Sequence, residues 1–131
     1  MDAINPATEE VVSRHPEHTP EQVVRMLDVA GRAAREWREV PIGRRLEVLS
    51  NAARILRQRV GELAATITRE MGKPIGQSEA EVEKCAVACD YFAEHAREYL
   101  ASQAIPSDAS RSYVRYDPLG VVFAIMPWNF P

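Results

Sequence analysis

The run Gly120–Met126 constrains the fold most, because it contains no polar side chain. A short, continuously apolar segment is typical of a strand that is covered on both faces in a parallel sheet. In a parallel sheet the next strand along the chain follows only after a crossover of about a dozen residues. The sequence ends at Pro131, well short of that. An exposed apolar strand also invites aggregation. We therefore expect a piece of a longer protein, in which other segments cover this strand.

Most of the preceding sequence predicts helices. Thr19-Pro20-Glu21-Gln22 has the pattern of a capping box with proline at the first helical position, so a helix begins at Pro20 and ends before Pro41. Its apolar positions recur at steps of three and four, which predicts one buried stripe. The stripe comprises Val23, Leu27, Ala30, Ala34 and Trp37.

Two further helical stretches follow. The pattern from Ile42 to Met71 predicts two packed helices or one bent helix, with a break at Gly61 and a stop at Gly72. A last helix is expected from about Ile75 to Ala101. The face expected to be buried carries Val82, Cys85, Cys89, Phe92, Ala96 and Leu100, and the solvated start carries Glu79, Glu81, Glu83 and Lys84.

Two shorter segments predict strands. Val11 and Val12 follow the turn-forming Asn5-Pro6 and suit an edge strand. Residues 112–116 alternate between polar and apolar side chains, as in a half-exposed strand, and Asp117-Pro118 ends it.

Composition narrows the class of protein. The chain has 131 residues, enough for one modest domain, and 19 acidic against 16 basic side chains give a net charge of −3. The basic residues are interleaved with glutamates, so a nucleic-acid partner is not expected. The longest uncharged run, Leu119–Pro131, is shorter than the ~20 residues of a membrane span, and the first residues have no secretion signal. With only two cysteines, a reduced, cytoplasmic setting fits best.

Most candidate reactive residues have a simpler structural interpretation. His15, His18 and His95 lack companions at metal-ligand spacing, so no metal site is expected. Glu79 and Glu83 share a helical face that is more simply a solvated surface than an acid–base pair. Cys85 or Cys89 could be a nucleophile, but two buried thiols are favoured, because a reactive thiolate needs a base or cation nearby and the adjacent Lys84 points about 100° away around the helix.

The turn Pro127-Trp128-Asn129-Phe130-Pro131 is the best candidate for chemistry. It follows the apolar strand at its carboxyl end, where α/β sheets bind ligands. The Asn129 side-chain amide is a neutral donor, suited to a developing oxyanion. The alternative is a structural turn in which Asn129 hydrogen-bonds its own backbone. From the motif alone this alternative is favoured.

These motifs together resemble the aldehyde dehydrogenase superfamily along the whole chain. The opening is similar to that family's Asn-Pro-Ala-Thr-Gly-Glu segment, with Glu9 replacing the usual glycine. Residues 70–74 are similar to its Glu-x-Gly-Lys-Pro element, and residues 118–131 match its strand and signature turn. The stretches 83–99 and 113–131 look closest to the succinate-semialdehyde dehydrogenase branch.

The resemblance implies an α/β fold, of which this chain is the mostly helical N-terminal portion. Residues 1–102 would be the helical part of the cofactor-binding domain, 103–117 a β arm that pairs subunits into a homo-oligomer, and 118–131 the first strand and signature turn.

The resemblance also implies a reaction. In that family a cysteine thiolate attacks an aldehyde, a hydride passes to NAD or NADP, and water releases the carboxylic acid. Asn129 would donate to the oxyanion, and the nicotinamide side of the cofactor site would be lined by Ile125, Met126, Pro127, Trp128 and Asn129. The family's nucleophile and base lie downstream of its signature turn, so the chain alone would be inactive.

A second hypothesis comes from a different class. The chain could be a free-standing helical protein that binds a partner through its apolar terminal strand, by strand addition to a sheet.

Overall fold

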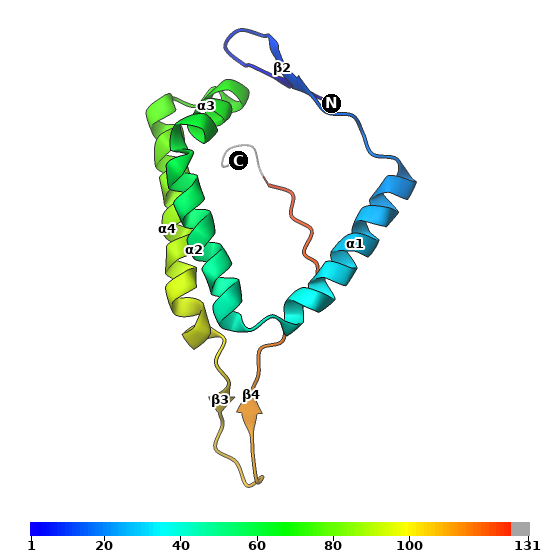
Figure 1. The fold of residues 1–131 in the computed structure, drawn as a ribbon, viewed down its shortest axis with the longest axis vertical. Helices are drawn as coiled ribbons and strands as arrows, with labels where there is room; N and C mark the ends of the chain where they lie inside the picture. The colour runs from blue at the N-terminus through cyan, green and yellow to red at the C-terminus, as the bar shows by residue number, and fades with distance from the viewer. Residues whose placement is uncertain (127–131) are drawn as a thin grey trace.

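The computed structural model describes residues 1–126. It is mostly helical, with four helices and four short strands in that part of the chain (Figure 1). In chain order these are β1 (Asp2–Ile4), β2 (Val11–Arg14), α1 (Pro20–Glu39), α2 (Ile42–Gln58), α3 (Val60–Met71), α4 (Ile75–Tyr99), β3 (Gln103–Ala104) and β4 (Tyr113–Val114).

An antiparallel hairpin of β1 and β2 opens the chain, with a register shift after Ala3. Asn5 organises its turn: the Oδ1 atom accepts from the amide of Ala7 at 2.9 Å, as in an Asx turn. Glu9 has a φ of 62°, in the left-handed region that glycine adopts without strain. This is the position at which the family that the sequence resembles has glycine. The strand β1 was not predicted, because Asp2–Ile4 is too short to show alternation.

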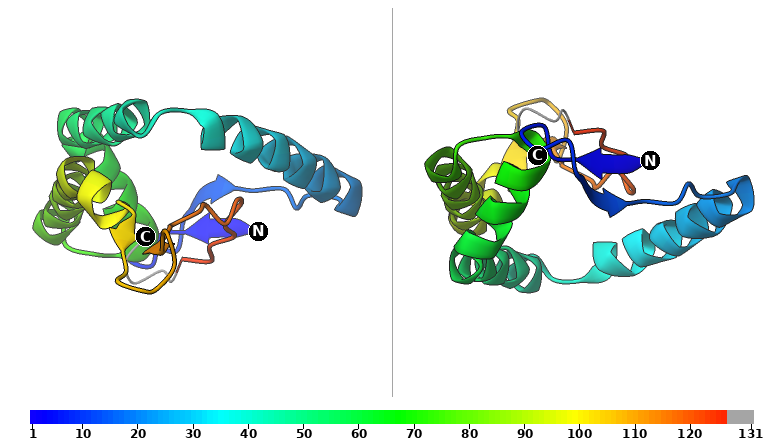
Figure 2. Two further views of the ribbon diagram at one scale, coloured as in Figure 1. Left: turned by 90° about the horizontal axis from the view of Figure 1, so that it is seen from below. Right: turned by 90° about the horizontal axis from the view of Figure 1, so that it is seen from above.

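Helix α1 begins where the sequence predicts, and both hydrogen bonds of the capping box are present between Thr19 and Gln22. The expected buried stripe is wrong for this chain, because α1 has no buried residue and Leu27 is 59% exposed. Figure 2 shows the reason: α1 projects away from the other helices and packs extensively on none of the described elements. Its amphipathic sequence lacks a partner surface within residues 1–126.

The core lies where α2, α3 and α4 meet, and α2 runs beside α4 (Figure 1). The buried apolar side chains are Ala53, Ala64, Val82 and Ala86, all small, which lets the helix axes approach closely. Arg57 of α2 ties the pair together at its surface, donating to Glu83 at 2.9 Å and to Asp90 at 2.6 Å on α4.

The break between α2 and α3 falls at Arg59, and not at Gly61, which lies inside α3. Gly72 ends α3 with a φ of 69°, as the sequence predicts for a glycine cap. A Cβ atom at Gly72 would lie 2.8 Å from Cγ of Pro6, so the N-terminal hairpin rests directly on this turn. The Asn-Pro and Gly-Lys-Pro motifs are therefore neighbours in space.

The strands β3 and β4 form a separate antiparallel hairpin beyond α4, in which Gln103 pairs with Val114 and Ala104 with Tyr113. Both strands are exposed along their length. The division into residues 1–102, 103–117 and 118–131 stays a prediction.

Candidate functional site

The predicted site begins at the end of the described chain, on an extended segment that follows β4. In Figure 1 this segment, residues 118–126, runs between α1 and the α2–α4 pair. Ile125 and Met126 are 81% and 68% exposed. Pro127, Trp128 and Asn129 lie outside the described residues, so their predicted roles remain predictions.

The strand expected at Gly120–Met126 is not formed within the described residues, and its side chains are not covered. Phe123 is 85% exposed and Val122 is 77% exposed. The physical reason is that a strand needs a neighbour for its backbone hydrogen bonds, and none of β1 to β4 lies beside this segment. The expectation of a strand buried on both faces is therefore wrong for this chain on its own.

One side chain of the segment contacts a larger surface. Val121 lines an apolar groove of about 600 Å³ together with residues at the C-terminal end of α1 and the cap residue that follows it, including Ala33, Ala34, Trp37 and Val40. The segment thus meets the end of α1 at Val121, whereas Ile125 and Met126 are not among the residues that line this groove.

The cysteines are not both buried, which corrects a second expectation. Cys85 is exposed and Cys89 is half-buried, and both are free thiols. The buried face of α4 is set by Val82 and Ala86, and Cys85 lies about 100° around the helix from Ala86.

The other candidate side chains have ordinary structural partners. His15 Nε2 lies 2.8 Å from Ser13 Oγ, and His95 Nδ1 lies 2.9 Å from the Tyr91 carbonyl oxygen, with the two rings stacked. Glu83 is bound by Arg57, so it does not act as half of a carboxylate pair with Glu79. Within residues 1–126 no group of acidic, histidine or cysteine side chains could hold a metal ion. No helix in the described range is both long and apolar enough to cross a membrane.

A buried ion pair was missed in the sequence. Glu81 is only 8% exposed and accepts from Lys73, although it was expected at the solvated start of α4. Beside this pair, the fully buried Ser78 hydroxyl lies 3.0 Å from that of Thr68 on α3. Helical spacing could have predicted the burial of Glu81, because Ser78, Glu81 and Val82 share the face of α4 that packs on its neighbours.

Shifted pKa values occur in surface ion pairs and one tyrosine pair. Hydrogen bonds to Asp90 and Glu83 raise the pKa of Arg57, and a hydrogen bond with Tyr91 raises the pKa of Tyr99. Asp117 likewise raises the pKa of Arg115. These interactions stabilise the charged form of each arginine and the protonated form of Tyr99, as structural pairing does.

Comparison with known proteins identifies the family of this chain. The family model described as "Aldehyde dehydrogenase family" matches residues 1–131. A probable succinate-semialdehyde dehydrogenase [NADP(+)] of Synechocystis sp. is 47% identical over 128 residues, covering 98% of this chain and 28% of the relative. The succinate semialdehyde dehydrogenase [NAD(P)+] Sad of Escherichia coli is 43% identical over 129 residues, with 98% and 28% covered.

Solved structures of other dehydrogenases have the same fold over the length of this chain. The succinic semialdehyde dehydrogenase of Streptococcus pyogenes, in complex with NADP+, superimposes with a TM-score of 0.93 at 32% identity, over 98% of this chain and 29% of that one. Glyceraldehyde-3-phosphate dehydrogenase of Methanocaldococcus jannaschii, complexed with NADP, gives a TM-score of 0.92 at 34% identity, over 100% and 28%.

The chain thus spans little more than a quarter of the length of the curated relatives it matches. The family model matches residues 1–131 in sequence, and the superposition on the Streptococcus pyogenes enzyme covers 98% of the chain. The chain belongs to the aldehyde dehydrogenase family.

Proposed function

We propose that this chain is the N-terminal part of a larger enzyme that oxidises an aldehyde to the carboxylic acid with NADP+ or NAD+. The observation that supports this most strongly is the 47% identity to a relative named as an NADP+-dependent succinate-semialdehyde dehydrogenase. Succinate semialdehyde is accordingly the proposed substrate. Because two solved relatives were determined with NADP, that cofactor is favoured over NAD.

The described residues fit such a cofactor in one respect. Ile125 and Met126 present exposed apolar surface at the end of the segment, and apolar surface suits contact with a nicotinamide ring. Pro127, Trp128 and Asn129 would extend this lining. When bound, the cofactor would accept a hydride from the carbon that becomes the carboxyl carbon.

Asn129 has the central role in the proposed chemistry. A cysteine thiolate from outside this chain would attack the aldehyde carbon, and the carbonyl oxygen would gain negative charge in that step. The side-chain N–H of Asn129 would donate to this oxyanion without bringing a fixed charge into the site. Hydride transfer would then give a thioester, and water would release the acid and restore the thiolate. Neither Cys85 nor Cys89 has this role, so the chain alone is proposed to be inactive.

The hairpin of β3 and β4 supports a proposal about assembly. The hairpin has two strands, so each strand has an outer edge that pairs with no other described strand. Tyr113 and Val114 of β4 are exposed. Unpaired edges of this kind are covered by another chain or segment in stable proteins. We assign residues 103–117 to contact with a second copy of the enzyme. Two free thiols support a reducing, cytoplasmic setting.

Substituting Asn129 in the enzyme as its native gene encodes it tests this proposal. Asn129→Ala should lower kcat with saturating succinate semialdehyde by about 10²–10³-fold, the usual effect of removing one oxyanion donor. Asn51→Ala is the matched control, because Asn51 is an exposed residue of α2 far along the chain from the signature turn, and it should retain normal turnover. Near-normal turnover of Asn129→Ala would reject the assignment.

One observation favours a second candidate function. The exposed apolar side chains of residues 119–126 could bind the edge of a partner's sheet if this protein stood alone. The two functions differ in one simple property, since the second requires a stable protein of this length with no dehydrogenase activity.

A further inference from the structure

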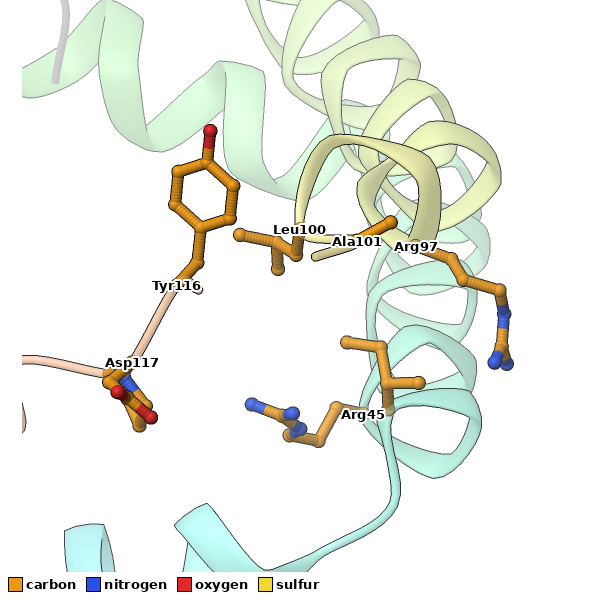
Figure 3. Close-up of a pocket in the computed structure, with 8 residues that line it drawn as sticks. Arg45, Arg97, Leu100, Ala101, Tyr116 and Asp117 are labelled. Atoms are coloured by element: carbon orange, nitrogen blue, oxygen red, sulfur yellow. The ribbon is translucent and has the colours of Figure 1, made fainter. Parts of the chain in front are cut away.

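Two arginines pair with the carboxylate of Asp117, and a third points toward it, where the ends of α1 and α2 lie near the segment after β4. Arg115 Nε donates to Asp117 Oδ2 at 2.9 Å, and its Nη2 lies 2.8 Å from the same oxygen. Arg38, from the last turn of α1, places Nη2 3.8 Å from Asp117 Oδ1. The guanidinium of Arg45, from the first turn of α2, points toward Asp117 from the other side (Figure 3).

The charges at this point do not balance. Two guanidinium groups pair with Asp117 and that of Arg45 points toward it, and among the described residues that line the adjacent pocket Asp117 is the only acidic one. Arg45 is the least satisfied of the three. Its Nε atom is buried and has no hydrogen-bond partner among the described residues. A buried donor without an acceptor is costly, so the site favours an additional acceptor with negative charge.

There is room for such a group. A pocket of about 440 Å³ lies between the first turn of α2, the C-terminal end of α4 and residues 116–118. One water molecule takes up ~30 Å³ of liquid, so a small oxyanion fits with space for water. Tyr116 also lines the pocket, but its hydroxyl, which accepts from Gln103 Nε2 at 3.3 Å, points away from Asp117 and Arg45 (Figure 3). Arg97 also lines the pocket, but its guanidinium points away from Asp117 (Figure 3).

We propose that this pocket binds a small oxyanion, a phosphate or a carboxylate, through the guanidinium group of Arg45. Arginine suits this ligand because its planar group of donors matches the oxygens of carboxylate and phosphate. Arg38 supplies further positive charge, while Arg115 holds Asp117 in place. The site uses none of the residues assigned to aldehyde oxidation, and its occupancy is measured without any turnover.

Binding of inorganic phosphate and of succinate to the protein as its native gene encodes it tests the proposal, at constant ionic strength. Line broadening in ³¹P NMR reports phosphate, and isothermal titration calorimetry reports both anions. Saturable binding of at least one anion is expected. Arg45→Gln should weaken that binding by about tenfold or more, the usual effect of losing a charged hydrogen-bond partner.

Arg54→Gln is the matched control, because Arg54 lies on the same helix and donates to Gln58 at 2.9 Å. It should leave anion binding unchanged. If Arg45→Gln does not fold, Arg38→Gln, which alters an exposed side chain, should still weaken binding measurably. Absence of saturable binding to the native protein would overturn the proposal, and so would equal losses in Arg45→Gln and Arg54→Gln.

Discussion

Gly72 is the residue at which a single added methyl group should disturb this fold most. Its φ of 69° lies in the left-handed region, where an L side chain costs about 1–2 kcal/mol. A Cβ atom there would also lie 2.8 Å from Cγ of Pro6, and the proline ring cannot rotate away. Overpacking of this kind costs about 1–3 kcal/mol. Gly72→Ala should therefore lower the free energy of unfolding by about 2–5 kcal/mol.

The two contributions can be separated. Gly72→Asn keeps a residue that tolerates the left-handed conformation, so it should lose mainly the contact energy with Pro6. Combining Gly72→Ala with Pro6→Ala should recover part of the loss, because the Cγ atom at 2.8 Å is removed. Urea denaturation followed by circular dichroism measures each change, and limited proteolysis of residues 1–15 reports release of the hairpin.

Gly61, at the opposite end of α3, provides the control. It lies inside α3 and a Cβ atom there would meet nothing within 4 Å. Gly61→Ala should stabilise the protein by up to about 1 kcal/mol through helix propensity alone. If Gly72→Ala and Gly61→Ala had the same effect, the reasoning about the cap and the Pro6 contact would be refuted.

Three further predictions concern the helices. Lys73→Met leaves the carboxylate of Glu81, only 8% exposed, without this partner and should cost about 3–5 kcal/mol in urea denaturation. Arg59→Gln, at an exposed pair, should cost much less, and similar losses in the two variants would contradict the buried pair. Thr19→Ala removes the capping box of α1 and should cost about 1 kcal/mol of helix stability, measured by hydrogen exchange of the amide of Gln22 and its neighbours; unchanged exchange would contradict it. Arg59 holds the pKa of Glu62 below its usual value, first by its hydrogen bond and then by its charge, so the stability from this pair is present above the unfolded pKa of about 4.3 and is lost as the pH falls through the lower folded pKa. Arg59→Gln should raise the pKa of Glu62 in an NMR titration, and an unchanged value would reject this cause.

Local signals predicted the helices well. The capping box places the start of α1, and Gly72 ends α3 as its sequence predicts. The break between α2 and α3 was misplaced because Gly61 is accommodated inside a helix, while Arg59 departs from helical geometry with a φ of −108° and a ψ of 16°. A single glycine lowers helix propensity without requiring a break.

Burial was harder to predict, because it depends on which surfaces meet. Periodicity identified apolar faces on α1 and α4, but α1 has no described helix to pack against, and the packed face of α4 carries Glu81 instead of Cys85. Backbone pairing of residues 120–126 likewise needs a neighbour that local sequence does not supply. Of the candidate site, the role of Asn129 stays a prediction that the family resemblance implies, whereas Arg38 and Arg45 lie near Asp117 although they are distant from it in sequence.

Whether this chain forms part of a larger dehydrogenase is decided by the intact mass of the protein made from its native gene. We expect a polypeptide several times longer than 131 residues, consistent with a chain that covers 28% of its relative. A monodisperse, stably folded monomer of 131 residues would contradict it.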